Sequence, residues 1–94
     1  MNPHSTAEQV GELRRAIARS RTAVADGMIV DLTGLDAEVA RITAIARNAP
    51  SSERALVLAA MEGLLLELDG LTVDLRRQRD VSLARQAADA YATD

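Results

Sequence analysis

The sequence contains no cysteine, tryptophan or phenylalanine, and its only aromatic residue is Tyr91. Without cysteine the chain can form no disulfide, thiol nucleophile or cysteine-based zinc site. Lysine is absent as well, so all 11 basic residues are arginine, which together with the alanine content suggests a GC-rich bacterial genome. The single histidine, His4, precedes the first expected helix, where order is rare. A lone histidine is also a poor zinc ligand and a poorly fixed general base.

Three further absences exclude classes of function or location. The formal net charge is −3, so the chain lacks the overall basic field that usually accompanies nucleic-acid binding. No apolar run approaches the ~20 residues that a membrane span needs. The opening segment "MNPHSTAEQV" lacks the apolar core of a secretory signal. We therefore expect a cytoplasmic protein that does not insert into a membrane.

The hydrophobic residues of the sequence are mainly aliphatic residues and alanine. Hydrophobic residues make up 48% of the 94 residues, which argues against disorder. Leucine and alanine dominate, and both are strong helix formers. This length is at most one domain, so we expect a single helical domain over residues 1–94.

The first expected helix covers residues 6–25. Ser5 is a suitable N-cap and Glu8 stands three residues later, which is the capping-box pattern. The helix has one apolar stripe at helical spacing, formed by Val10, Leu13, Ile17 and Val24.

The segment "DGMIVDLTGLD", residues 26–36, decides the fold. A helix running through it would contain two glycines, each costing about 1 kcal/mol relative to alanine. A break uses the same residues better: Gly27 can close the first helix in the left-handed conformation, and Thr33 can cap the next. Ile29 and Leu32 would then pack inward. We favour the break, and the alternative is one kinked helix of roughly forty residues.

The second expected helix covers residues 34–48 and the third covers 52–80. "RNAPSSE" separates them, because Pro50 moves the preceding residue away from helical angles. The third helix carries a heptad seam of the kind that packs against another helix; its members are Val57, Met61, Leu64, Leu68, Leu71 and Leu75. Beyond the seam we expect a helical extension, prone to fraying, that reaches residue 92.

These elements predict an all-α, small antiparallel three-helix bundle with up-down-up connections and the third helix longest. The alternative is a long two-helix hairpin with a kink near residues 27–34.

No catalytic, cofactor or metal site is expected. Carboxylates follow the third helix at Glu62, Glu67, Asp69 and Asp74. Di-iron bundles require inward-pointing Glu-x-x-His pairs, and the sequence has none. The glycines are isolated, so no phosphate-binding loop is present. We therefore expect a protein that is not an enzyme.

Two arginine clusters are the main basic features. One comprises Arg14, Arg15, Arg19 and Arg21, and the other Arg76, Arg77 and Arg79. Arginine clusters can bind phosphates, which leaves a small DNA-binding regulator or antitoxin as an alternative function. The structural alternative is a solvated face with local ion pairs, namely Arg76–Asp80, Asp74–Arg77 and Glu12–Arg15. On the second helix, Glu38 and Arg41 are expected to form a further exposed pair. We consider nucleic acid an unlikely partner, since no aromatic residues are available to stack on bases.

The third helix is so rich in apolar residues that we expect two short partner helices to leave part of it uncovered, with Leu58, Leu65 and Leu66 widening its stripe. We therefore predict a non-enzymatic chaperone or adaptor that binds a partner's amphipathic helix. The predicted partner-binding residues are Met61, Leu65, Leu68, Val73 and Tyr91. The alternative is a self-associating structural protein, for example a homodimer.

The size, acidity and Val57–Leu75 seam resemble small helical chaperones of bacterial flagellar (type III) export. "VDLTGLDAEV" also resembles a segment in short uncharacterised proteins of GC-rich alphaproteobacteria. The first resemblance implies that amphipathic helices hold an export substrate. It differs in the central break, because those chaperones are expected to be long hairpins.

Overall fold

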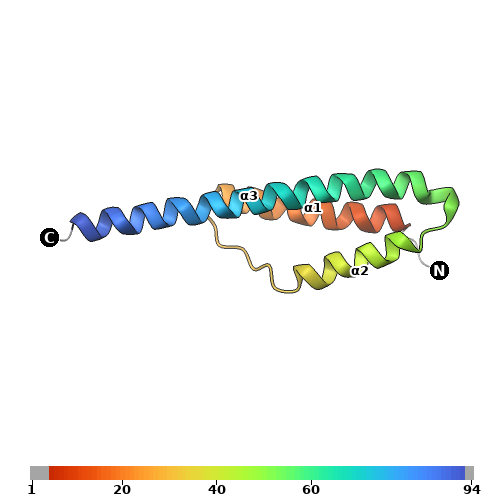
Figure 1. Cartoon of the computed structure of the whole chain (residues 1–94), viewed down its shortest axis with the longest axis horizontal. Coiled ribbons are helices and arrows are strands. Elements are labelled where there is room, and N and C mark those ends of the chain that lie inside the picture. Colours follow the sequence, from red (N-terminus) through yellow and green to blue (C-terminus); the bar gives the residue numbers. More distant parts are fainter. Residues whose placement is uncertain (1–4, 93–94) are drawn as a thin grey trace.

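The protein is a bundle of three α-helices, seen in a computed structural model that describes residues 5–92. The helices are α1 (Thr6–Ala25), α2 (Leu35–Arg47) and α3 (Arg54–Ala92). The chain runs up, down and up, so α1 and α3 are parallel and α2 is antiparallel to both (Figure 1). The predicted all-α three-helix fold is confirmed, and the described residues contain no strand.

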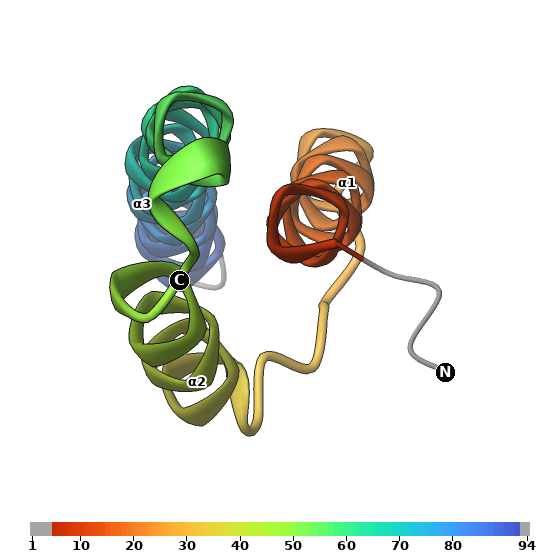
Figure 2. The same ribbon diagram turned by 90° about the vertical axis from the view of Figure 1, so that its right-hand side faces the viewer.

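The molecule is long and thin, with extents of 66 × 22 × 19 Å. Most of this length is α3, whose 39 residues span about 58 Å at 1.5 Å per residue. Seen end on, the three helices occupy the corners of a triangle (Figure 2). Only the first part of α3 lies beside the other helices, and the rest continues past them alone (Figure 1).

The core lies along the line where α3 meets α1 and α2. Heptad spacing places its residues in repeating rows, because side chains seven apart share a helix face. The fully packed cluster comprises Val10, Leu13, Ile17 and Val24 of α1, Ile42 of α2, and Leu64 and Leu71 of α3. Met61, Leu68 and Leu75 complete the α3 seam at the margin of this cluster. The predicted seam is therefore the core of the bundle.

Both ends of α1 follow the sequence signals. The backbone N–H of Glu8 donates to Ser5 Oγ at 3.2 Å, which confirms Ser5 as the N-cap. Gly27 has a φ of 81°, the left-handed conformation in which glycine commonly closes a helix. The N–H of Met28 then donates back to the carbonyl of Ala23 at 3.0 Å. The predicted break between the first two helices is confirmed.

Two details of this connection were predicted wrongly. Thr33 does not cap α2: its N–H donates to Asp31 Oδ1 at 2.9 Å, and Gly34, at a φ of 84°, is the N-cap. Ile29 does not pack inward but is 95% exposed, whereas Val30 and Leu32 pack against the core. The hydrogen bond to Asp31 holds the threonine in a local turn, which competes with its use as a cap.

The connection from α2 to α3 is short. Asn48 ends α2, and a single 3₁₀ turn over Ser51–Glu53 leads into α3. α3 therefore begins at Arg54, two residues later than predicted, because the first turn after Pro50 is 3₁₀. From there α3 runs without interruption to Ala92, so the expected extension is continuous helix.

Candidate interaction site on α3

A polar clamp holds α1 against α3. Arg21 Nε donates to Asp74 Oδ2 at 2.8 Å, and its Nη1 lies 3.5 Å from Glu67 Oε2. The hydrogen bond to Asp74, aided by the negative charges of both carboxylates, raises the pKa of Arg21 above its ordinary value. Asp74 therefore pairs across the two helices with Arg21, and not with Arg77 as predicted. The clamp fixes the side of α3 that faces α1.

Two glycines of α3 leave room for arginines of α1. A Cβ atom at Gly63 would lie 2.8 Å from Arg14 Nη1, and one at Gly70 would lie 2.4 Å from Arg21 Cζ. The two glycines are one heptad apart, as are the two arginines, so the same contact repeats along the parallel pair. Arg14 and Arg21 of the first arginine cluster therefore pack against α3 within the bundle.

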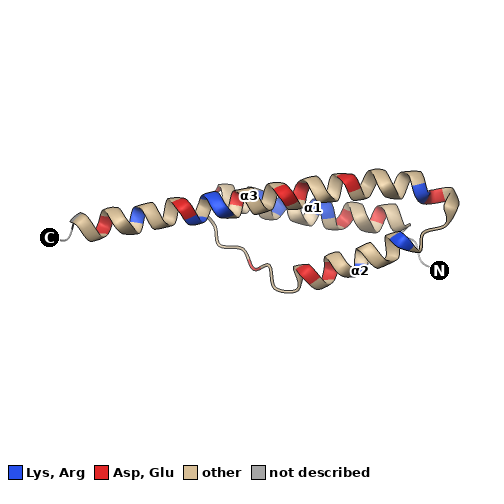
Figure 3. Ribbon diagram, in the orientation of Figure 1, with Lys and Arg blue, Asp and Glu red and all other residues tan. Residues whose placement is uncertain are grey.

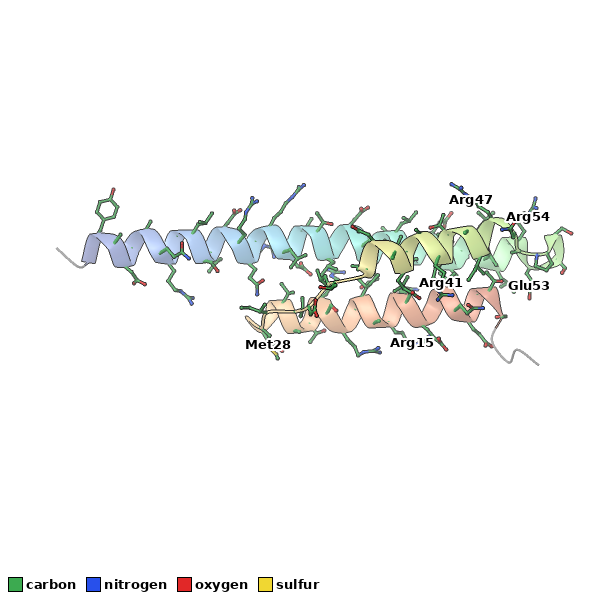
Figure 4. The ribbon with its side chains drawn as sticks, turned by 90° about the horizontal axis from the view of Figure 1, so that it is seen from below. Arg15, Met28, Arg41, Arg47, Glu53 and Arg54 are labelled. Atoms are coloured by element: carbon green, nitrogen blue, oxygen red, sulfur yellow. The ribbon has the colours of Figure 1, made fainter. Side chains whose placement is uncertain are left out.

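Among residues 5–92, no comparable polar contact between side chains joins α2 to α1 or α3. The one buried residue of α2 is Ile42, and its Glu38–Arg41 ion pair is internal to the helix. Arg41 Nε donates to Glu38 Oε2 at 3.2 Å, which confirms that predicted pair and lowers the pKa of Glu38. Arg41 and Arg47 are both carried on this helix (Figure 4). Apolar contact is what places α2 over the seam of α3.

The five predicted partner-binding residues fall into two groups. Met61 and Leu68 pack against the core, so the structure does not bring them to an open surface. Leu65 and Val73 are exposed on α3 at 52% and 50%, and Tyr91 is 84% exposed far along the same helix. The structure does not bring the two groups together, because the heptad seam and the exposed leucines lie on different faces of α3.

The exposed group belongs to a longer apolar surface on the side of α3 turned away from the core. We call it the outer face, and it comprises Leu58, Glu62, Leu65, Leu66, Asp69 and Val73, all exposed. The two acidic residues lie between the apolar ones, because each is three or four residues from its apolar neighbours. An apolar strip with acids along its centre is the main unpartnered feature of the bundle.

Leu58 and Leu66 were not among the predicted site residues. Leu66 is 70% exposed, more than either Leu65 or Val73. Their spacing carried a usable signal, since Leu58 and Leu65 are seven apart, as are Leu66 and Val73. Two heptad rows that do not coincide with the main seam predict a second apolar face.

Residues 76–92 of α3, which we call the extension, have no neighbouring helix (Figure 1). Every side chain from Arg79 to Tyr91 is exposed. The face that carries Val73 continues along it, with spacings of three and four residues, through Arg76, Asp80, Leu83, Ala87 and Tyr91. The outer face and the extension are therefore two parts of one uncovered helix surface.

Charge divides these two parts. The outer face carries two acids and no base, whereas the root of the extension carries Arg76, Arg77 and Arg79 beside a single acid, Asp80. The ribbon in Figure 3 changes from acidic (red) to basic (blue) residues along α3 where that helix leaves the bundle. Arg79 lies 3.7 Å from Asp80, an exposed contact between neighbours in sequence.

A hollow of about 530 Å³ lies where α1 stops and the extension begins. Val24, Ile29 and Val81 supply its apolar lining. Gln78 closes one side, because its Nε2 donates to the carbonyl of Met28 at 3.0 Å. Met28 lies on the segment that leaves α1 (Figure 4). The hollow is lined by mixed residue types, and no catalytic set converges in it.

Within residues 5–92 there is no cluster of three or more His, Asp or Glu side chains placed to hold a metal ion. The candidate His4 lies outside these residues. Across the same part of the chain, no helix is both long and apolar enough to cross a membrane. What the surface offers chemically is aliphatic area and charge.

No family model, curated protein or solved structure matches this chain.

Proposed function

We propose that the chain is a non-enzymatic helical interaction module, a chaperone or adaptor that binds an amphipathic helix of a protein partner along the outer face of α3. The observation that carries this proposal is the exposure of Leu58, Leu65, Leu66 and Val73 on one side of one helix. Exposed apolar surface grouped in this way is typical of interaction sites. Helix-to-helix contact is a common means of covering such a strip.

The outer face also has the chemistry to select its partner. Glu62 and Asp69 run along its centre, so a helix that packs there must place basic or uncharged residues against them. Like charges in those positions would repel, and unpaired acids would be desolvated at a cost. The partner helix therefore combines aliphatic residues with arginine or lysine at heptad spacing.

The resemblance to flagellar export chaperones bears on this proposal in one respect. The Val57–Leu75 seam on which it rests forms the core of the bundle, where α1 and α2 pack against it. A chaperone role would thus use the outer face to hold its substrate, with the seam serving the fold. Export of flagellar proteins is the specific setting that this resemblance favours.

Site-specific photo-crosslinking tests the proposal. A photoreactive amino acid replaces Leu66 on the outer face, and the same residue replaces exposed Ala44 on α2 as the matched control. In the cells that produce the protein, we expect an adduct with a protein partner, either another protein or a second copy of the chain, from position 66 alone. Leu65→Glu in the same chain should remove it. If position 66 gives no adduct with any protein chain, its own or another, beyond the level of position 44, the proposal is wrong.

A DNA-binding role is the second candidate, and the exposed Arg76, Arg77 and Arg79 on the extension favour it. Arg14 and Arg21 contribute less, because both lie against α3. A gel-shift at low salt with Arg76→Glu as the control tests this role. A shift that weakens steeply with salt and is lost in the variant would support it.

A further inference from the structure

We propose that the helix bound by the outer face is α3 of a second copy of this chain, packed antiparallel, so that the extension of each copy covers the outer face of the other. This inference rests on the proposed function, because it names the partner of the same surface. Four properties of α3 lead to it.

The first property is the matching length of the two uncovered parts. The outer face runs from Leu58 to Val73, which span about 24 Å of helix, and the extension spans about 25 Å. One is an uncovered face and the other is a helix without a neighbour. Reciprocal packing about a twofold axis near Val73 covers both parts in both copies, which is the geometry of an isologous interface.

The second property is the instability expected of a bare extension. Most helical stability in proteins comes from the packing of one face, and residues 76–92 pack on no helix of their own chain. Every side chain from Arg79 to Tyr91 is exposed, and these include Val81, Leu83 and Tyr91. Packing on a second copy supplies the missing tertiary contact.

The third property is charge. A parallel pair would place each charge on α3 against its own copy, with Asp69 near Asp69 and Arg77 near Arg77, which is repulsive. An antiparallel pair centred on Val73 instead places Asp69 level with Arg77, and does so twice by symmetry. Tyr91 then lies level with Ala55 at the start of the partner's helix. Antiparallel packing is the arrangement that joins opposite charges.

The fourth property is the available area and space. Two α3 helices paired over residues 55–91 share roughly 55 Å of length, and a strip roughly 10 Å wide on each gives a total near 1,100 Å². This exceeds the roughly 1,000 Å² that a biological interface needs. The outer face points away from the core, so the α1 and α2 helices of the two copies lie on opposite sides of the pair.

Mass measurement on the full chain tests the association itself. Light scattering after gel filtration, at ~100 µM and low salt, should give about twice the monomer mass of 10.0 kDa. Asp69→Arg should weaken the dimer by roughly tenfold, because it places arginine against Arg77 in both halves. The double variant Asp69→Arg with Arg77→Glu should recover most of this loss. A monomer under these conditions, or a charge swap without recovery, would overturn the inference.

Disulfide trapping tests the orientation, and the absence of native cysteine makes each trap specific. Val73→Cys, near the proposed axis, should form a covalent dimer. Tyr91→Cys should not, because its two copies would be roughly 54 Å apart, but it should crosslink with Ala55→Cys in a mixture. Ala40→Cys on α2 gives the background. A Tyr91→Cys homodimer above that background would show parallel packing and refute the proposal.

The two proposals fail separately. A monomeric chain that still crosslinks to another protein from position 66 retains the proposed function and loses this inference, because the partner would then be a different protein. A dimer whose position 66 crosslinks only to its own chain retains the inference and excludes a separate partner. In both outcomes circular dichroism at 222 nm should confirm that the variants remain helical.

Discussion

The two halves of α3 are parts of one continuous helix, yet they have opposite surroundings. In the first half, up to Leu75, an apolar seam faces α1 and α2 and is covered. In the second half the same seam positions are Gln78, Ser82 and Arg85, and no helix covers them. The comparison teaches that residues with high helix propensity, namely leucine, alanine and arginine, continue along α3 beyond the point where its burial ends.

The largest expected effect on stability comes from a core substitution in the first half of α3. The same substitution in the second half should have little effect. Leu64 is fully buried at the centre of the core, so Leu64→Ala should lower the free energy of unfolding by about 2–5 kcal/mol. Leu83→Ala removes the same atoms from an exposed position and should change it by less than ~0.5 kcal/mol in the monomer. Urea unfolding at low micromolar concentration measures both. A comparable loss in the two variants would show that the extension is packed within the monomer.

The course of the chain was largely predictable because its local signals agree with its apolar periodicity. Ser5 and Gly27 each mark an end of α1, and Pro50 marks the connection to α3. The seam at intervals of three and four residues then shows which side of α3 is buried. The errors at Thr33 and Ile29 arise in the connection from α1 to α2, where a hydrogen bond to Asp31 decides the turn and no periodicity applies.

A smaller effect on stability is expected from substituting the two α3 glycines that face α1, and it should differ between them. Gly63→Ala should raise the free energy of unfolding by up to about 1 kcal/mol, because alanine favours helix and the free end of Arg14 can move aside. Gly70→Ala should bring a smaller gain or a loss, since it displaces the guanidinium of Arg21 from its two carboxylates.

A double-mutant cycle provides the control for the second glycine. In an Arg21→Ala background, Gly70→Ala should recover the full helix-propensity gain, because no guanidinium remains to be displaced. Thermal or urea unfolding of the four chains gives the coupling. Equal gains for Gly63→Ala and Gly70→Ala in the native background would mean that the clamp adds nothing to stability.

The site was only partly predictable, because the positions of α1 and α2 decide which apolar residues of α3 are covered. The sequence indicates that α3 has more apolar residues than two short partner helices can cover, but it does not show where α2 will lie. Met61 and Leu68 proved to be on the covered side, whereas Leu65 and Val73 are on the open side. The Arg21 clamp was also unforeseen, because Asp74 has a nearer candidate in sequence, Arg77, and the pairing across helices depends on the register of α1 against α3.

The smallest expected effect concerns the connection that positions α2. The hydrogen bonds from the Thr33 hydroxyl and backbone N–H lower the pKa of Asp31. A carboxyl whose folded-state pKa is depressed contributes stability above its unfolded pKa of about 3.9, and that contribution is lost as the pH falls through the lower, folded value. Asp31→Asn keeps an oxygen that can accept from Thr33 but cannot titrate. Between pH 7 and pH 3 the urea concentration at the unfolding midpoint should therefore fall further for the native chain than for Asp31→Asn. Glu38→Gln gives the comparison for a carboxyl on α2 itself. Identical losses in the native chain and Asp31→Asn would show that the turn before α2 persists in acid, leaving Ile42 and its apolar neighbours as the anchor of that helix.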